Sequence, residues 1–340
     1  MNYVKPLCLV LGVLLLALTV RDMDMAAVLN HVRDIGLLGM AFVLLFFAAT
    51  FLMDVAGWQL TLLTVPLDLR WLWRLYLVRT AGEAINNVTP FGSMGGEPVK
   101  ALMLKARYGI GYQDSSVSLI LAKTLILMAL VVFLALGFGL LLPAERLSDS
   151  YKAIAGLGLA GLATGIVLFF LMQRYRISSW VGRHLGARWP GFRWERAVRL
   201  VHELDERVAG FYTAHRGRMV GAFLFALLNW LMGVGEVYAV MYLLGHPVSF
   251  VDAWIMEALV QLVRAGTSFI PSSLGAQEGT FKVVCAALTG DPSLGLACAV
   301  VRRVREVIWI AAGIGLWWTF AGGEAEAEAP QDAALEAPRP

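Results

Sequence analysis

Charged residues are scarce in this sequence. Only 16% of its 340 residues are Asp, Glu, Lys or Arg, whereas 59% are hydrophobic. An ordinary soluble domain is roughly a quarter charged. A chain of this length cannot hide so much apolar surface in a core of its own. The shortage of charge therefore argues against a soluble protein and predicts one that lipid covers. No nucleic-acid partner is expected.

Cysteine and histidine are also rare. The three cysteines, Cys8, Cys285 and Cys298, all lie inside apolar runs and show no paired spacing. This placement is typical of buried packing residues, and it argues against a disulfide or a zinc site. The five histidines are scattered, without an HExxH motif or a nearby cysteine. Neither a metal nor another cofactor is expected.

Catalytic and nucleotide-binding motifs are missing from the chain. It contains no GxSxG, no paired-Asp motif and no Walker A sequence. These absences predict a protein that is not an enzyme and does not hydrolyse ATP. Glu97 with Asn86 is a weak imitation of a catalytic pair, so an intramembrane lipid-modifying enzyme stays open as an alternative.

The apolar runs predict an all-α, polytopic transmembrane bundle. A membrane span needs about 20 apolar residues, and backbone groups in lipid must pair within their own helix. About eight segments qualify, the first of them interpreted as a retained span rather than a cleaved signal peptide. They are residues 6–20, 35–63, 116–142, 154–172, 219–244, 250–270, 281–301 and 304–320.

The loops between these segments differ in basic charge. Residues 64–115 carry six Lys or Arg and residues 173–218 carry ten Arg, whereas 21–34 and 143–153 carry two each and 245–249 carries none. Basic loops stay in the cytoplasm. The alternation predicts a multi-pass protein of the bacterial cytoplasmic (inner) membrane with its N-terminus in the cytoplasm.

The chain is predicted to form a single membrane domain, residues 1–320, followed by a disordered tail, 321–340. Its halves, about 1–172 and 219–320, are joined by the cytoplasmic Arg-rich segment 173–218. That segment contains an amphipathic pattern of Trp194, Val198, Val201, Leu204, Val208 and Phe211. It is either a surface that gathers anionic lipid headgroups or a connector that lies in the interface.

Two stretches interrupt the apolar pattern, residues 86–98 (NNVTPFGSMGGEP) and 267–280 (TSFIPSSLGAQEGT). In each, a glutamate follows a proline by seven positions, Glu97 after Pro90 and Glu278 after Pro271. Lys100 and Lys282 follow the two glutamates. Arg79 and Arg264, each with an Ala-Gly nearby, precede the two stretches. The shared order predicts an internal repeat.

The repeat favours transport, because broken segments at matching positions of two halves are typical of a transporter's binding site. Glu97 and Glu278 would then serve as gating, proton-coupled or cation-binding groups. The alternative is two ordinary loops whose glutamates cap helices. The sense of the repeat also stays open: it is inverted if residues 250–270 form a half-helix, and both hairpins approach from the cytoplasm if those residues cross fully.

Several further charges lie inside apolar runs, where a charge is costly and usually faces a cavity or a partner. Asp54 and Lys123 are predicted to pair between helices, and Arg302 and Glu306, four residues apart, on one helix face. Snorkelling to the interface is the alternative for Arg302 and Arg303. The other such charges are Glu236, Glu257, Arg264 and Arg305.

The two broken stretches also carry a resemblance. The pattern Asn86-x-x-Thr89-Pro90, followed by Gly96-Glu97-Pro98 and Lys100, resembles the flippase-like membrane domain of the lysylphosphatidylglycerol synthases. Residues 271–279, PSSLGAQEG, resemble that family's P-x-x-L-G-x-x-E-G signature, and residues 302–309 its last span. The hopanoid-associated branch is the most similar, through the Gln-Glu-Gly of 277–279 and the Lys-Thr of 123–124.

The resemblance implies lipid translocation between leaflets, of a lipid or a polyprenyl-linked lipid. Lys123 stands without the acidic neighbours that the family often has, which puts a coupling role there in doubt, and the aminoacyl-transferring domain is not found. A non-catalytic scaffold of a lipid-biosynthetic complex is an alternative. Expected partners are a membrane lipid substrate, anionic headgroups and lipid-biosynthetic proteins. The candidate translocation residues are Asn86, Thr89, Pro90, Gly96, Glu97, Lys100, Pro271, Gly275, Glu278, Lys282, Arg79, Arg264, Asp54, Lys123, Arg302 and Glu306.

Overall fold

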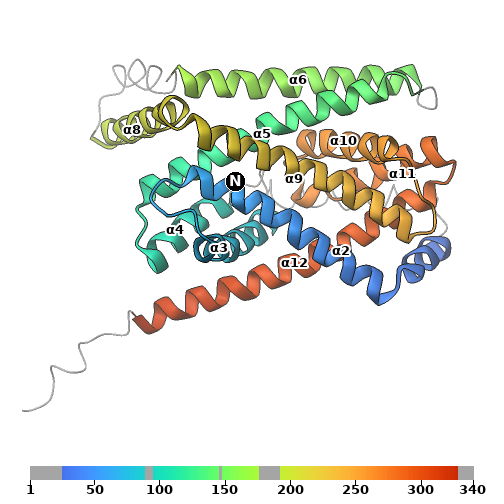
Figure 1. Cartoon of the computed structure of the whole chain (residues 1–340), viewed down its shortest axis with the longest axis horizontal. Helices are drawn as coiled ribbons and strands as arrows, with labels where there is room; N and C mark the ends of the chain where they lie inside the picture. The colour runs from blue at the N-terminus through green and yellow to red at the C-terminus, as the bar shows by residue number, and fades with distance from the viewer. Residues whose placement is uncertain (1–24, 89–94, 145–147, 176–191, 328–340) are drawn as a thin grey trace, which may run out of the picture.

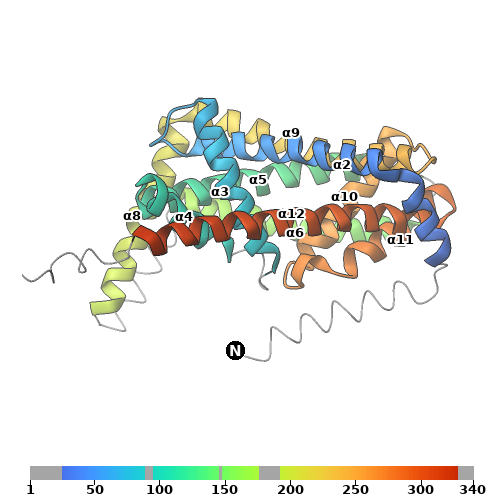
Figure 2. The same cartoon turned by 90° about the horizontal axis from the view of Figure 1, so that it is seen from below.

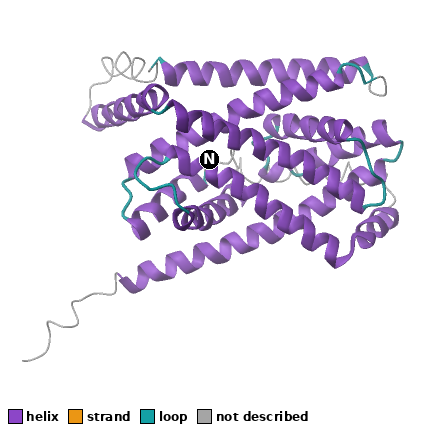
Figure 3. Cartoon of the chain, in the orientation of Figure 1, coloured by secondary structure: helices purple, strands orange, loops and turns teal. Residues whose placement is uncertain are grey.

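The computed structural model describes residues 25–88, 95–144, 148–175 and 192–327. Within these ranges the chain is helical and no strand occurs (Figure 3). This architecture confirms the predicted all-α membrane bundle. The helices are α2 (Met25–Thr61), α3 (Leu69–Val88), α4 (Gly96–Tyr108), α5 (Tyr112–Leu141), α6 (Asp149–Arg174), α8 (Phe192–Ala214), α9 (Arg216–Leu243), α10 (Phe250–Gly266), η1 (Pro271–Ser273), α11 (Ala276–Thr289) and α12 (Pro292–Ala327).

Long helices run along the long axis of the bundle (Figure 1). Four of them, in α2, α5, α6 and α9, are long and apolar enough to cross a membrane. Helix α12 is longer than three of these, with 36 residues, but a group of charged residues interrupts its apolar sequence. Helix α2 bends at Gly36, whose φ of 64° favours glycine. The predicted first span, 6–20, and most of the tail lie outside the described residues.

Two helical hairpins enter the bundle from opposite ends. Hairpin 1 is α3 with α4, and Trp71 and Tyr108 meet at its open end, with ring centroids 5.4 Å apart. This end lies at the same end of the bundle as α8 (Figure 1), whose Arg207 pairs with Asp114 shortly after α4. Hairpin 2 is α10 with α11, and its open end lies at the other end of the bundle (Figure 2). There His246 contacts His31 of α2, with ring centroids 5.8 Å apart. The two hairpins are therefore related by an inverted repeat.

Helix length explains why hairpin 2 does not cross. Helices α10 and α11 have 17 and 14 residues, which at ~1.5 Å per residue is short of a hydrocarbon core of about 30 Å. The predicted segment 281–301 is interrupted by the turn at Gly290 and Asp291, where α11 ends and α12 begins. Hydrogen bonds from Ser293 lower the pKa of Asp291, and His31 and His246 act in the same direction. The turn thus lies at the open end of hairpin 2.

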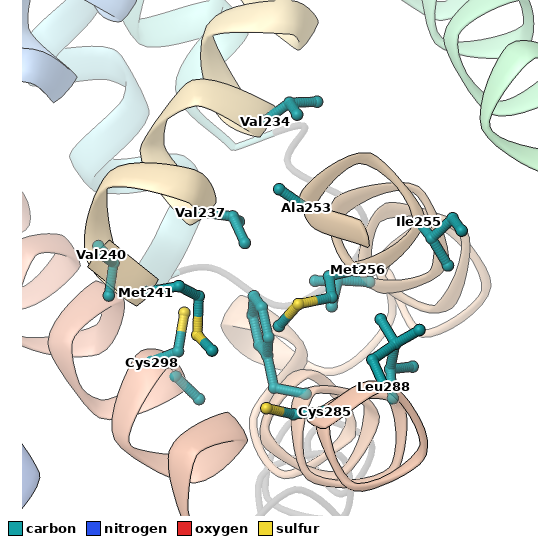
Figure 4. Close-up of a cluster of buried hydrophobic side chains, with 14 of the residues drawn as sticks. Val234, Val237, Val240, Met241, Ala253, Ile255, Met256, Cys285, Leu288 and Cys298 are labelled. Atoms are coloured by element: carbon teal, nitrogen blue, oxygen red, sulfur yellow. The ribbon is translucent and has the colours of Figure 1, made fainter. Parts of the chain in front are cut away.

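An apolar core surrounds hairpin 2. Valines and Met241 from α9, Met256 from α10 and Leu288 from α11 converge in it (Figure 4). Cys285 and Cys298 lie in this core as free, buried thiols, as the sequence predicts for them, and Cys8 lies outside the described residues. The core holds hairpin 2 between α9 and α12.

Helix α8 packs on protein through the described part of its apolar stripe. Val208 and Phe211 are buried, and both cluster with Leu121 of α5. Tyr212 donates a hydrogen bond of 3.1 Å to Gln173 of α6. The side chains of residues 192–201 lie outside the description. The described part of the stripe therefore connects α8 to α5 and α6.

Candidate functional site

The tips of the two hairpins meet in the middle of the bundle. The Ser272 hydroxyl donates to the backbone carbonyl of Asn87 at 3.3 Å. Ser272 and Ser273 have φ of 49° and 48°, a strained conformation for residues other than glycine. Such strain persists only where surrounding contacts hold it. Thr89 and Pro90, predicted as site residues, lie outside the described residues.

A group of charges lies beside the tip of hairpin 1; we call Asp54, Arg79, Glu83, Glu97 and Lys100 the first-hairpin cluster. The Lys100 ammonium lies 2.5 Å from Glu83 and 3.0 Å from Glu97. Arg79 pairs with Asp54 of α2. Three carboxylates and two cations therefore share this region.

The backbone of hairpin 1 is built for close contact. A Cβ added to Gly82 would lie 2.4 Å from the Lys100 side chain, and one added to Gly96 would lie 2.0 Å from the Gly82 carbonyl oxygen. The Asn86 side-chain oxygen accepts a 2.6 Å hydrogen bond from the Gly96 N–H. The glycines thus allow α3 and α4 to approach closely enough for a fully buried Lys100 to reach Glu83.

A second group lies beside the tip of hairpin 2; Arg264, Glu278, Arg303 and Glu306 form the second-hairpin cluster. Arg303 of α12 lies 2.5 Å from Glu278 and 2.6 Å from Glu306. Glu278 also accepts a 2.8 Å hydrogen bond from the backbone N–H of Gly275, which caps α11. Arg264 reaches Glu306 at 3.4 Å. Two cations balance two carboxylates here.

A third group is more deeply buried; the core ion-pair cluster is Glu236 of α9, Glu257 of α10, and Arg302 and Arg305 of α12. Arg302 pairs with Glu257 and, at 3.8 Å, with Glu236, which also pairs with Arg305. All four side chains are almost fully buried. A buried charge is tolerated when its partner is buried with it, so this cluster ties α12 to α9 and α10.

Two predicted pairings and one alternative are wrong. Asp54 pairs with Arg79 rather than with Lys123, whose side chain is exposed. Arg302 pairs with Glu257 rather than Glu306, since it faces α10. Arg302 and Arg303 do not snorkel, because both find carboxylates inside the bundle.

The hairpin tips bring most of the predicted residues together. Asn86, Gly96, Glu97 and Lys100 lie around hairpin 1, while Pro271, Gly275, Glu278 and half-buried Lys282 lie on hairpin 2. Two members of the two hairpin clusters, Glu83 and Arg303, are absent from the predicted set. Glu83 precedes Pro90 by seven residues, as Arg264 precedes Pro271, so the repeat spacing contains a signal for it. Arg303 shows its role only through its contact with Glu278.

The arrangement suits recognition of a polar group at membrane depth. Irregular backbone and charge survive there when protein or a water-filled cavity covers them. Glu97 and Glu83 are about a quarter exposed, at 27% and 25% of the side chain. Within the described ranges, no cluster of three His, Cys, Asp or Glu residues could hold a metal ion.

Comparison with known proteins identifies the family of the chain. Residues 7–315 match the family described as the lysylphosphatidylglycerol synthase TM region. A relative from Methanothermobacter thermautotrophicus, a UPF0104 membrane protein, is 26% identical over 277 residues, which cover 76% of this chain and 78% of the relative. No solved structure matches the chain. The family match spans nearly all of the bundle, so this chain belongs to the family of the lysylphosphatidylglycerol synthase transmembrane region.

Proposed function

We propose that this protein moves a lipid, or a polyprenyl-linked lipid, between the two leaflets of a membrane. One observation carries the proposal: two broken hairpins enter from opposite ends and meet tip to tip, at Ser272 and Asn87. In transporters, discontinuous helices of inverted repeats form the substrate site near the middle of the bilayer. A barrier made of two opposed hairpins can open toward either leaflet.

The charges beside the tips supply the polar path that a headgroup needs. A headgroup in hydrocarbon loses its water, so it must exchange hydration for protein groups. Glu97, the more exposed of the two predicted glutamates, is proposed as the gating or coupling group of hairpin 1. Glu278 and Arg303 are proposed to hold hairpin 2 in place. Neither covalent chemistry nor ATP hydrolysis is proposed for this chain.

The proposed setting is the bacterial cytoplasmic membrane, with the N-terminus in the cytoplasm and a role beside hopanoid or envelope-lipid biosynthesis. The basic loops support this orientation. Anionic headgroups are proposed to gather at the Arg-rich segment 173–218. Lipid-biosynthetic proteins are proposed as partners that supply or consume the lipid.

Reconstitution tests the proposal. Proteoliposomes with the full chain and a labelled phospholipid should show faster loss of outer-leaflet label to an impermeant quencher than empty vesicles. Glu97→Gln and Glu278→Gln should slow this movement, because each alters a charge beside a tip. Asp149→Asn, at a fully exposed position, is the matched control and should leave it unchanged.

A wild-type rate equal to that of empty vesicles counts against translocation. Full activity in both glutamate variants removes their assigned role. The scaffold alternative is favoured instead if the protein does not flip lipid and deletion of 321–340 abolishes its function in cells. New lipid products formed by the purified protein from membrane extract would favour an enzyme.

A further inference from the structure

A short helix lies at the end of the bundle where hairpin 2 opens (Figures 1 and 2). It consists of residues 25–35, the part of α2 before the bend at Gly36, and we call it the end strap. Val28 and Ile35 are buried in the same apolar core as hairpin 2, and half-buried Val32 packs beside them. Most of the other described side chains of the strap are exposed. Few apolar contacts therefore hold the strap on the bundle.

The bend at Gly36 gives the strap a hinge. Gly36 has φ 64° and ψ −179°, a backbone conformation that is essentially confined to glycine. A Cβ added to this residue would meet no atom within 4 Å, so the described chain does not enclose the bend. The strap and the rest of α2 are thus two separate helical segments, and the strap can turn about Gly36 while both segments stay helical.

Titratable groups from three segments of the chain meet at the strap. His31 of the strap contacts His246 in the loop between α9 and α10, with ring centroids 5.8 Å apart and ring planes at 85°. Asp291 lies in the turn between α11 and α12, where its carboxylate accepts hydrogen bonds of 2.8 and 2.6 Å from Ser293. These hydrogen bonds lower the pKa of Asp291 most, and both histidines act in the same direction. Two histidines therefore share the field of one carboxylate.

The other titratable groups near this contact do not balance a second histidine charge. Arg33 and Asp34 of the strap are both exposed, and their charges are opposite. Asp252, in the first turn of α10, exchanges hydrogen bonds with Ser249, which caps that helix. Tyr242 of α9 is exposed, and tyrosine is uncharged at neutral and acid pH. Acidification therefore adds positive charge at two touching rings, with Asp291 as their shared counter-charge.

We propose that the contact between His31 and His246 is a pH-sensitive latch, which holds the end strap beside hairpin 2 at neutral pH and releases it on acidification. Histidine is the side chain that gains its charge between about pH 8 and pH 5. While one of the two rings is charged, Asp291 balances it and the contact is kept. Once both are charged, two cations lie against each other with one carboxylate between them, and their repulsion frees the strap. The inference goes beyond the proposed function, because it concerns the position of the strap, whatever the protein carries.

Pulsed electron paramagnetic resonance on the full chain in detergent tests the latch. Spin labels are attached at Asn30→Cys on the strap and at Leu228→Cys on α9, both exposed positions. Cys8→Ser leaves the buried Cys285 and Cys298 as the native thiols. At about pH 8 one distance between the labels is expected, with the strap held. Between about pH 8 and pH 5 the ratio of released to held strap should rise about tenfold, the order expected for two like charges at this separation.

Substitutions of the histidines separate the latch from other effects of acid. His31→Gln and His246→Gln should each abolish the rise, because the repulsion needs both charges, and the double glutamine variant should behave like either single one. Lysine at both positions supplies permanent charges and should give the released distance already at about pH 8. His202→Gln on α8, where the histidine pairs with Glu206, is the matched control and should keep the full rise.

Three results would overturn the latch. The first is a wild-type distance distribution that stays the same between about pH 8 and pH 5. The second is a full acid response in either glutamine variant, which would place the sensor elsewhere. The third is a released strap in the glutamine variants at about pH 8, which would show that the rings hold the strap by packing rather than by charge. Because the readout is the position of the strap, none of these results bears on lipid movement.

Discussion

The two hairpins carry similar motifs but are neutralised in different ways. In hairpin 1, Glu97 pairs with Lys100 of its own helix, and its side chain is 27% exposed. In hairpin 2, Glu278 pairs with Arg303 of α12, and its side chain is 5% exposed. Hairpin 1 therefore carries its counter-charge within itself, whereas hairpin 2 takes it from a neighbouring long helix. We propose that hairpin 2, whose glutamate pairs with α12, is the more fixed side of the tip contact and hairpin 1 the side that moves. Hairpin 1 balances its glutamates with its own Lys100, and Arg79 joins it to Asp54 of α2.

Removing the counter-charge of each glutamate should show the difference in stability between the two hairpins most strongly. Arg303→Met leaves Glu278 buried without a cation and should lower the free energy of unfolding by about 3–5 kcal/mol. Lys100→Met should cost only about 1–3 kcal/mol, because Glu83 and Glu97 are partly hydrated. Unfolding in a mixed-detergent titration measures both values.

A second substitution separates lost pairing from lost packing. Glu278→Gln added to Arg303→Met removes the orphaned charge and should restore part of the stability. Arg33→Met, at an exposed position, is the control for loss of an arginine. Equal losses for Arg303→Met and Lys100→Met would contradict the difference between the hairpins.

The close backbone contacts follow the same division, and their disruption should have an intermediate effect. A Cβ on Gly96 would lie 2.0 Å from the Gly82 carbonyl oxygen, inside hairpin 1, and one on Gly295 would lie 2.2 Å from the Phe281 carbonyl oxygen, between hairpin 2 and α12. Each change to alanine should destabilise by about 1–3 kcal/mol through overpacking.

Transport should then distinguish the two glycine sites. Gly96→Ala deforms the hairpin proposed to move, so it should slow flipping more than Gly295→Ala does at equal stability, as measured in the proteoliposome assay. Gly139→Ala, where a Cβ meets nothing within 4 Å, is the control. An equal effect of both changes on flipping would assign the same role to both hairpins.

The tip contact itself should show the smallest stability effect. Ser272→Ala removes the hydrogen bond to Asn87, and interhelical hydrogen bonds in membranes contribute on average about 0.6 kcal/mol. Ser272→Gly also removes that bond but relieves the positive φ of 49°, so it should unfold at or above the denaturant midpoint of Ser272→Ala. A lower midpoint for Ser272→Gly would show that the backbone at this position is not strained.

The sequence alone was sufficient for the membrane bundle and for the shared order of residues in the two hairpins. Lipid excludes charge from most of the chain, so apolar runs predict helices and the few charges inside them stand out. The spacing from Pro90 to Glu97 and from Pro271 to Glu278 shows the repeat directly. These features depend only on residue composition and on residue order along the chain, so they are visible without the folded structure.

Only the tertiary structure decided the sense of the repeat and the partners of each charge. Residues 250–270 are apolar enough for a span, but α10 ends at Gly266 and α11 returns to the same end of the bundle, which makes the repeat inverted. Arg302 could reach Glu306 along its own helix, yet it faces Glu257 of α10. Ion pairs between helices depend on how the helices rotate against one another, and packing of the whole bundle sets that rotation.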